Sequence, residues 1–102
     1  MSLFARIRAE GPSKIIVHRF GASLRQWAAG QLTRQNIIDG FALVGSDITE
    51  LDALKATYDA LPTNNTNNII IKSQWINRME DVFMLIETGD YTEAKAKSAL
   101  GF

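Results

Sequence analysis

Residues 47–61, DITELDALKATYDAL, carry the clearest helical pattern in the chain. Their apolar side chains step by three, three, four and three residues, which places on one helical face Ile48, Leu51, Leu54, Tyr58 and Leu61. Asp47 followed by Glu50 has the form of a capping box, and Pro62 ends the segment. The stretch predicts an amphipathic helix and makes helix packing the basis of the fold.

A long helix is predicted downstream of this segment. Residues 63–68, TNNTNN, form the longest polar stretch and predict an exposed loop. From about residue 67 to residue 88 the helical spacing returns, with one apolar face made of Ile69, Ile76, Met79, Phe83 and Ile86. Gly89 is expected to end this helix, and Thr92 to cap a short last helix that runs through Ala99.

Two further helices are predicted upstream. Thr33 has the character of an N-cap for a helix over residues 34–44. Between residues 13 and 29 the apolar side chains step by four, four and three, again on one face: Ile16, Phe20, Leu24 and Trp27. Gly21 and the β-branched run 15–17 weaken this second pattern, so a strand at residues 15–17 stays an alternative.

These segments predict an all-α fold in a single small domain over residues 1–102. We expect about four to six helices, the longest near residues 67–88, and a basic N-terminal arm over about residues 1–12. A chain of 102 residues with 46% hydrophobic residues builds a modest core, and small domains often gain stability by association. No run reaches the ~18 apolar residues that indicate a membrane span, so no membrane partner is expected.

Groups that serve catalysis or metal binding are scarce in this sequence. The chain has no cysteine, which excludes thiolate nucleophiles and sulfur-ligated zinc. It has a single histidine, His18, and no serine lies in a nucleophile-elbow pattern. The acidic residues fit capping or solvated positions, and the seven glycines form no phosphate-binding loop. We therefore expect a protein that is not an enzyme and that uses no cofactor and no metal.

The net charge of zero hides a strong asymmetry along the chain. Residues 1–34 contain six basic residues and one acid, a net charge of +5, whereas residues 35–66 contain one basic residue and five acids, a net charge of −4. The candidate partner-binding basic face consists of Arg6, Arg8, Lys14, His18 and Arg25. Three interpretations stay open: a face for an acidic or anionic partner, a solvated surface, and pairing with the acidic middle third within or between subunits.

Both ends of the sequence carry apolar side chains. Phe4 and Ile7 lie near one end, and Leu100 and Phe102 lie at the other. Terminal segments are usually poorly ordered unless they are tied down. These residues are candidates for docking on a neighbouring subunit, and folding back on the chain's own core is the equal alternative.

The predicted helices over residues 33–44 and 47–61 have the outline of a helix-turn-helix. The second helix, which would enter the DNA groove, carries four acids and only one basic residue, Lys55. Because phosphate attraction supplies much of the affinity for DNA, this helix would be repelled. Binding to nucleic acid is therefore possible but not favoured.

The stretch from Leu32 to Leu54, LTRQNIIDGFALVGSDITELDAL, continued by YDAL at residues 58–61, resembles small helical proteins encoded in tailed-bacteriophage genomes. The resemblance covers less than a third of the chain. It implies a structural or assembly protein of the virion, such as a head–tail connector, adaptor, tail-completion or decoration protein. Such a protein is expected to form a homo-oligomer and to bind other virion proteins, in the virion or in the host cytoplasm before assembly. The alternative is a small regulator or inhibitor that binds nucleic acid or a host protein.

Overall fold

The computed structural model describes residues 3–10, with side chains up to Ile7, and residues 20–101. These residues form six helices and no strand, which confirms the all-α prediction. The helices are α1 (Leu3–Glu10), α2 (Phe20–Ala28), α3 (Arg34–Gly40), α4 (Ser46–Asp59), α5 (Thr66–Glu87) and α6 (Glu93–Leu100). The alternative of a strand at residues 15–17 falls outside the described residues.

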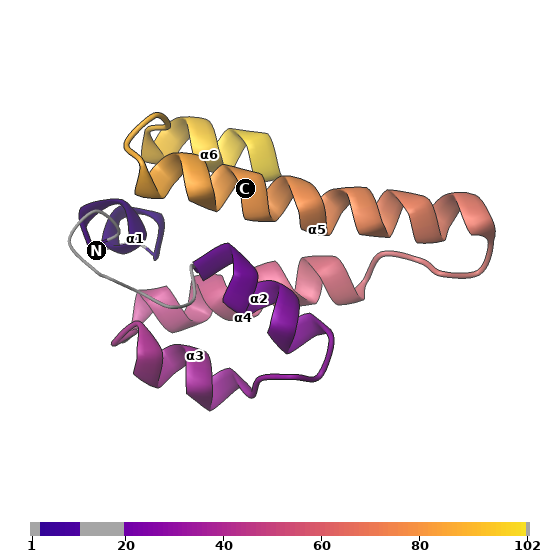
Figure 1. Cartoon of the computed structure of the whole chain (residues 1–102), viewed down its shortest axis with the longest axis horizontal. Coiled ribbons are helices and arrows are strands. Elements are labelled where there is room, and N and C mark those ends of the chain that lie inside the picture. Colours follow the sequence, from indigo (N-terminus) through magenta and orange to yellow (C-terminus); the bar gives the residue numbers. More distant parts are fainter. Residues whose placement is uncertain (1–2, 11–19, 102) are drawn as a thin grey trace.

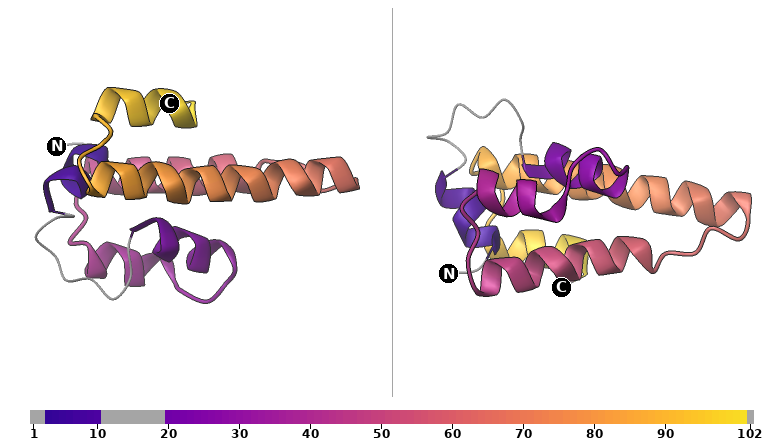
Figure 2. Two further views of the ribbon diagram at one scale, coloured as in Figure 1. Left: turned by 45° about the horizontal axis from the view of Figure 1, so that its top comes forward. Right: turned by 90° about the horizontal axis from the view of Figure 1, so that it is seen from below.

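Helix α5 is the element around which the others are arranged (Figure 1). Helices α2 and α3 lie on one side of it and α6 lies on the other, while α4 runs alongside α5 in the opposite direction (Figure 2). Helix α1 lies across the end of this arrangement and contacts α4, α5 and α6. Helices α2, α4 and α6 therefore pack on α5, α1, or both, whereas α3 packs on α2.

The centre of the core is a group of aromatic rings around Phe83 of α5. The ring of Phe83 stacks on Phe4 of α1 at a centroid distance of 5.2 Å and meets the edge of Phe20 of α2 at 4.6 Å. Phe20 in turn makes an edge contact of 5.2 Å with Phe41, which follows α3. All four rings are buried, so one aromatic group joins helices that are far apart in the sequence.

Most of the predicted helix boundaries agree with the structure. The long helix, expected over about 67–88, is α5 at Thr66–Glu87, and the Asn65 side chain caps it by accepting a hydrogen bond from the backbone of Asn68. Thr33 and Thr92 cap α3 and α6 as predicted. These caps form because a side-chain oxygen satisfies a backbone N–H that has no partner inside the helix.

Two predicted features of the middle segment were wrong. Helix α3 does not continue to residue 44 but ends at Gly40, and Ala42 takes a positive φ of 53° in the turn that follows. Asp47 does not cap α4, which begins at Ser46 after Gly45 and has no side-chain cap. The Asp47 carboxylate instead accepts a charge-assisted hydrogen bond from the Arg6 guanidinium and a weaker one from the Val44 backbone.

Gly21, which weakens the helical pattern of α2, has a packing role in the structure. A Cβ atom on residue 21 would lie 2.9 Å from the Glu80 Cα and 3.1 Å from its carbonyl oxygen on α5. Since these neighbours are backbone atoms, they cannot move aside as a flexible side chain can. The glycine therefore lets α2 approach α5 closely enough for Phe20 and Leu24 to be buried.

We expect Gly21→Ala to lower the free energy of unfolding by about 1–3 kcal/mol, because the added methyl group separates two packed helices. Gly40→Ala is the matched control, since nothing lies within 4 Å of a Cβ at that position. The control should leave stability unchanged or raise it slightly. Urea unfolding followed by circular dichroism measures both. Equal effects of the two variants would contradict the close-approach role of Gly21.

No helix in the described part of the chain is long and apolar enough to cross a membrane.

Candidate protein-interaction arm

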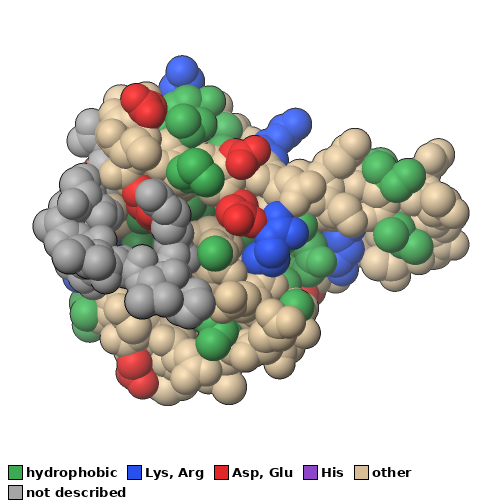
Figure 3. Space-filling model, viewed as in Figure 1, with side chains coloured by type: hydrophobic (Ala, Val, Ile, Leu, Met, Phe, Trp, Pro, Cys, Tyr) green, Lys and Arg blue, Asp and Glu red, His purple; other side chains and the backbone are tan. Residues whose placement is uncertain are grey.

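The first part of α5, with the loop before it, projects from the body of the molecule (Figures 1 and 3). We call residues 61–75 the arm. None of these residues is buried, and Ile76 is the first residue along α5 that enters the core. The helical part of the arm, residues 66–75, is therefore anchored in the core at one end and has its sides open to solvent.

Three consecutive isoleucines form an apolar collar on the arm. Ile69, Ile70 and Ile71 are 50%, 48% and 53% exposed. Because successive residues of a helix point about 100° apart, the three side chains face three directions instead of one. Only two other large hydrophobic residues of the described chain are exposed, Val44 and Met84. The collar is therefore apolar on three sides within a single turn of the helix.

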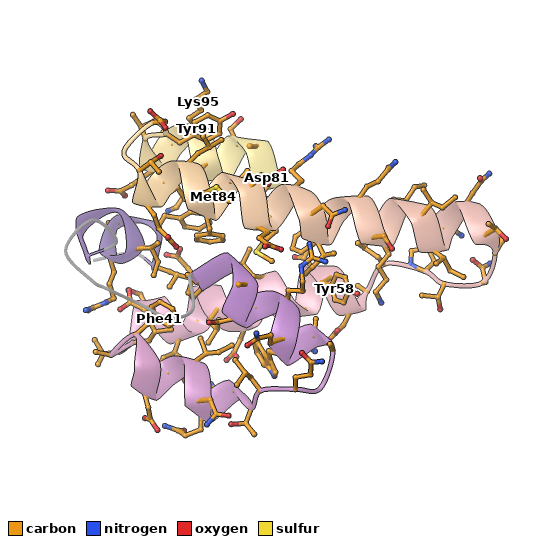
Figure 4. All side chains as sticks on the ribbon, in the orientation of Figure 1. Phe41, Tyr58, Asp81, Met84, Tyr91 and Lys95 are labelled. Carbon is orange, nitrogen blue, oxygen red and sulfur yellow. The ribbon has the colours of Figure 1, made fainter. Side chains whose placement is uncertain are left out.

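Contacts at its base hold the arm in place. The rings of Tyr58 on α4 and Trp75 on α5 lie 6.0 Å apart, and the Lys72 ammonium sits 4.5 Å from the centre of the Tyr58 ring. The same ammonium donates to the carbonyl oxygen of Leu61 at 3.5 Å. These contacts fix α5 against the end of α4, where Tyr58 lies (Figure 4), so the collar is presented by an ordered helix.

Two neighbouring hollows on α5, which we call the furrow, lie between the arm and the body of the molecule. Its first hollow, of about 150 Å³, is lined by Ile71, Gln74, Trp75 and Arg78. Its second hollow, of about 460 Å³, lies between α5 and α6 and is lined by Gln74, Asn77, Arg78, Asp81, Val82, Leu85, Tyr91 and Ala99. Gln74 and Arg78 line both hollows, which therefore lie next to each other along α5. Asp81 and Tyr91 lie on the side of α5 that carries α6 (Figure 4).

Two members of the predicted basic face form ion pairs inside the chain. The Arg6 Nε atom lies 2.5 Å from a carboxylate oxygen of Asp47, whose side chain is completely buried. The Arg25 Nε atom lies 2.5 Å from Glu80 on α5, and Arg25 also donates to the side chain of Asn77. For Arg6 the structure therefore shows pairing with the acidic middle third. Arg8 lies in α1 with an undescribed side chain, and Lys14 and His18 fall outside the described residues.

Of the two alternatives for the apolar ends, the structure shows the second for the residues described: they fold back on the chain's own core. Phe4 and Ile7 are 1% and 3% exposed, and Leu100 is 5% exposed. They are buried because α1 packs across the ends of α4, α5 and α6 and covers them. Phe102 falls outside the described residues.

The collar was not recognised as a site from the sequence. Periodicity assigned Ile69 to the buried face of the long helix, although Ile70 and Ile71 follow it directly. That adjacency was the available indication, because three neighbouring apolar residues cannot all face one core.

An exposed ion pair joins α3 to α4. Arg34 donates two hydrogen bonds of 2.8 and 2.9 Å to Asp52, and these bonds hold the pKa of Asp52 below its ordinary value. Since the folded-state pKa is lowered, the pair contributes stability above the ordinary aspartate range and loses it as the pH falls through the folded-state pKa. We expect a carboxyl NMR titration to show a low midpoint for Asp52 that rises in Arg34→Gln. An unchanged midpoint in the variant would contradict this assignment.

No group of three or more histidine or acidic side chains in the described part of the chain is placed to hold a metal ion. Several acids form ion pairs within the chain: Asp47 with Arg6, Asp52 with Arg34, and Asp59 with Lys55. The chain matches no protein-family model, and neither a curated protein nor a solved structure is significantly similar to it.

Proposed function

We propose that this chain is a non-enzymatic assembly protein of a bacteriophage particle, which acts through protein–protein contacts made by the arm. The observation that carries the proposal is the collar of three half-exposed isoleucines on a projecting helix. Burying an isoleucine side chain fully stabilises a complex by about 1.5–3 kcal/mol, so covering three half-exposed ones contributes about 3 kcal/mol. That contribution is large enough to decide whether a small protein associates.

The kind of assembly protein follows from the resemblance of residues 32–61 to small helical phage proteins. Head–tail connectors, adaptors, tail-completion proteins and decoration proteins all work by fitting between other subunits. A small anchored domain with a projecting arm suits such a role, because the domain supplies stability and the arm reaches the neighbour. The partners are copies of this chain and other virion proteins, in the virion or in the host cytoplasm before assembly.

Binding of nucleic acid or of a host protein, the alternative from the sequence, has less support. Arg6 and Arg25 already pair with Asp47 and Glu80, which lowers their attraction for phosphate. The arm itself carries a single charged residue, Lys72, and that ammonium contacts Tyr58.

The test is binding of the chain to itself and to each purified virion protein, measured by light scattering and titration. The variant Ile69→Gln/Ile70→Gln/Ile71→Gln should weaken association about 100-fold, as expected when about 3 kcal/mol is lost. Val44→Gln is the matched control, since Val44 is 60% exposed and lies away from the arm. A wild-type chain that stays monomeric and binds no virion protein would overturn the proposal, as would a triple variant that binds equally well.

A further inference from the structure

The first hollow of the furrow has the spacing of a helix-packing socket. Its lining residues, Ile71, Gln74, Trp75 and Arg78, stand at positions i, i+3, i+4 and i+7 of one helix. Four residues at this spacing form the hole that receives one side chain of a facing helix in knobs-into-holes packing. No helix of the described chain fills this hollow, which stays open at about 150 Å³.

The side chain best suited to fill this hollow in a second copy is that of Ile71, one of the four lining residues. Ile71 is 53% exposed and lies near the middle of the face that the four lining residues share. A second copy that presents the same face would place its Ile71 in the hollow and would receive the first copy's Ile71 in return. A surface that supplies both the knob and the hole is self-complementary, as a two-fold interface requires.

Charge decides the relative direction of the two helices. A parallel pair would set Arg78 beside Arg78 and Asp81 beside Asp81, and like charges in contact are destabilising. In an antiparallel pair with Ile71 level with the middle of the opposite hollow, the two-fold axis passes between residues 72 and 73. Arg78 then lies level with Asn67 and Asn68 of the other copy, whose side-chain oxygens accept hydrogen bonds from a guanidinium.

We propose that two copies of this chain associate through antiparallel pairing of their α5 helices, each Ile71 filling the hollow of the other. This inference rests on the proposed function and names one partner of the arm. The tip of each arm reaches toward the second hollow of its neighbour, where Asp81 lies. Ile69 faces away from the interface, about 160° from Ile71 on the helix, and stays open for another virion protein.

Single cysteines test the geometry, because the native chain contains none. Across the proposed axis the two copies of residue 74 are offset along the helix by about 4 Å, and the two copies of residue 78 by about 16 Å. Under mild oxidation Gln74→Cys should form a disulfide-linked dimer, whereas Arg78→Cys alone should not. A mixture of Arg78→Cys and Asn67→Cys should form a disulfide-linked heterodimer of the two variants. Efficient self-linking of Arg78→Cys would indicate parallel pairing and overturn the proposal, as would the absence of all three links.

Matched variants on the two sides of the collar supply a second test. Ile71→Gln should raise the dimer dissociation constant at least about tenfold, whereas Ile69→Gln should change it less than about threefold. Equal effects would overturn the proposed interface. A monomeric chain that still binds a virion protein through the collar would overturn only the dimer and leave the proposed function standing. A chain for which neither association occurs would overturn both.

Discussion

Phe83→Ala should lower the free energy of unfolding by about 3–5 kcal/mol, the range for large aromatic truncations in a packed core. Phe83 is fully buried and its ring contacts both Phe4 and Phe20. The substitution therefore removes the side chain that joins α1 and α2 to α5, and it leaves a cavity where the three helices meet. Urea unfolding followed by circular dichroism measures the loss.

Met84→Ala is the matched control for Phe83→Ala, because it truncates the next residue of the same helix. Met84 is 43% exposed, and alanine is a good helix former, so this variant should change stability by less than about 1 kcal/mol. If Phe83→Ala cost no more than Met84→Ala, the aromatic group would not be the centre of the core.

Arg6→Met is expected to cost about 3–5 kcal/mol, because it leaves the buried Asp47 carboxylate without its cation. The Asp47 side chain is completely inaccessible, whereas that of Arg6 is 18% exposed. The hydrogen bond that Asp47 accepts from the Val44 backbone at 3.3 Å cannot replace a guanidinium. Thermal and urea unfolding should both show the loss, and α1 should be the helix most affected.

Two further variants separate the buried pair from ordinary surface charge. Lys55→Met removes the cation of the exposed i,i+4 pair with Asp59 and should cost less than about 1 kcal/mol. The double variant Arg6→Met/Asp47→Leu should be more stable than Arg6→Met alone, since it removes the uncompensated charge as well. A double variant less stable than Arg6→Met would mean that Asp47 stabilises the fold independently of Arg6.

The helices and most of their caps could be predicted because their causes are local. Thr33 and Thr92 each cap the helix that follows, and the pattern of Ile76, Met79 and Phe83 defines the buried face of α5. Such features depend on residues within one or two turns of each other. The sequence therefore contained the information needed to place them.

Features that depend on distant residues could not be predicted in this way. Asp47 has the sequence context of a cap, but Arg6, 41 residues away, provides a stronger partner. In the sequence Gly21 only weakens a helical pattern, and its packing against the backbone of Glu80 is evident only in the structure. The exposure of the arm depends on where α4 ends relative to α5. Periodicity defines the apolar face of a helix, but it does not show which part of that face another helix covers.

The central claim is that the collar on the arm is a protein contact surface, and the most direct measurement is the solvent exposure of its methyl groups. In methyl NMR with a soluble paramagnetic agent, the signals of Ile69, Ile70 and Ile71 should be strongly relaxed in the dilute chain. On association, Ile70 and Ile71 should become protected several-fold, while the buried Ile37 serves as an unchanged reference. Collar methyl groups that stay equally exposed in the assembled state would contradict the account.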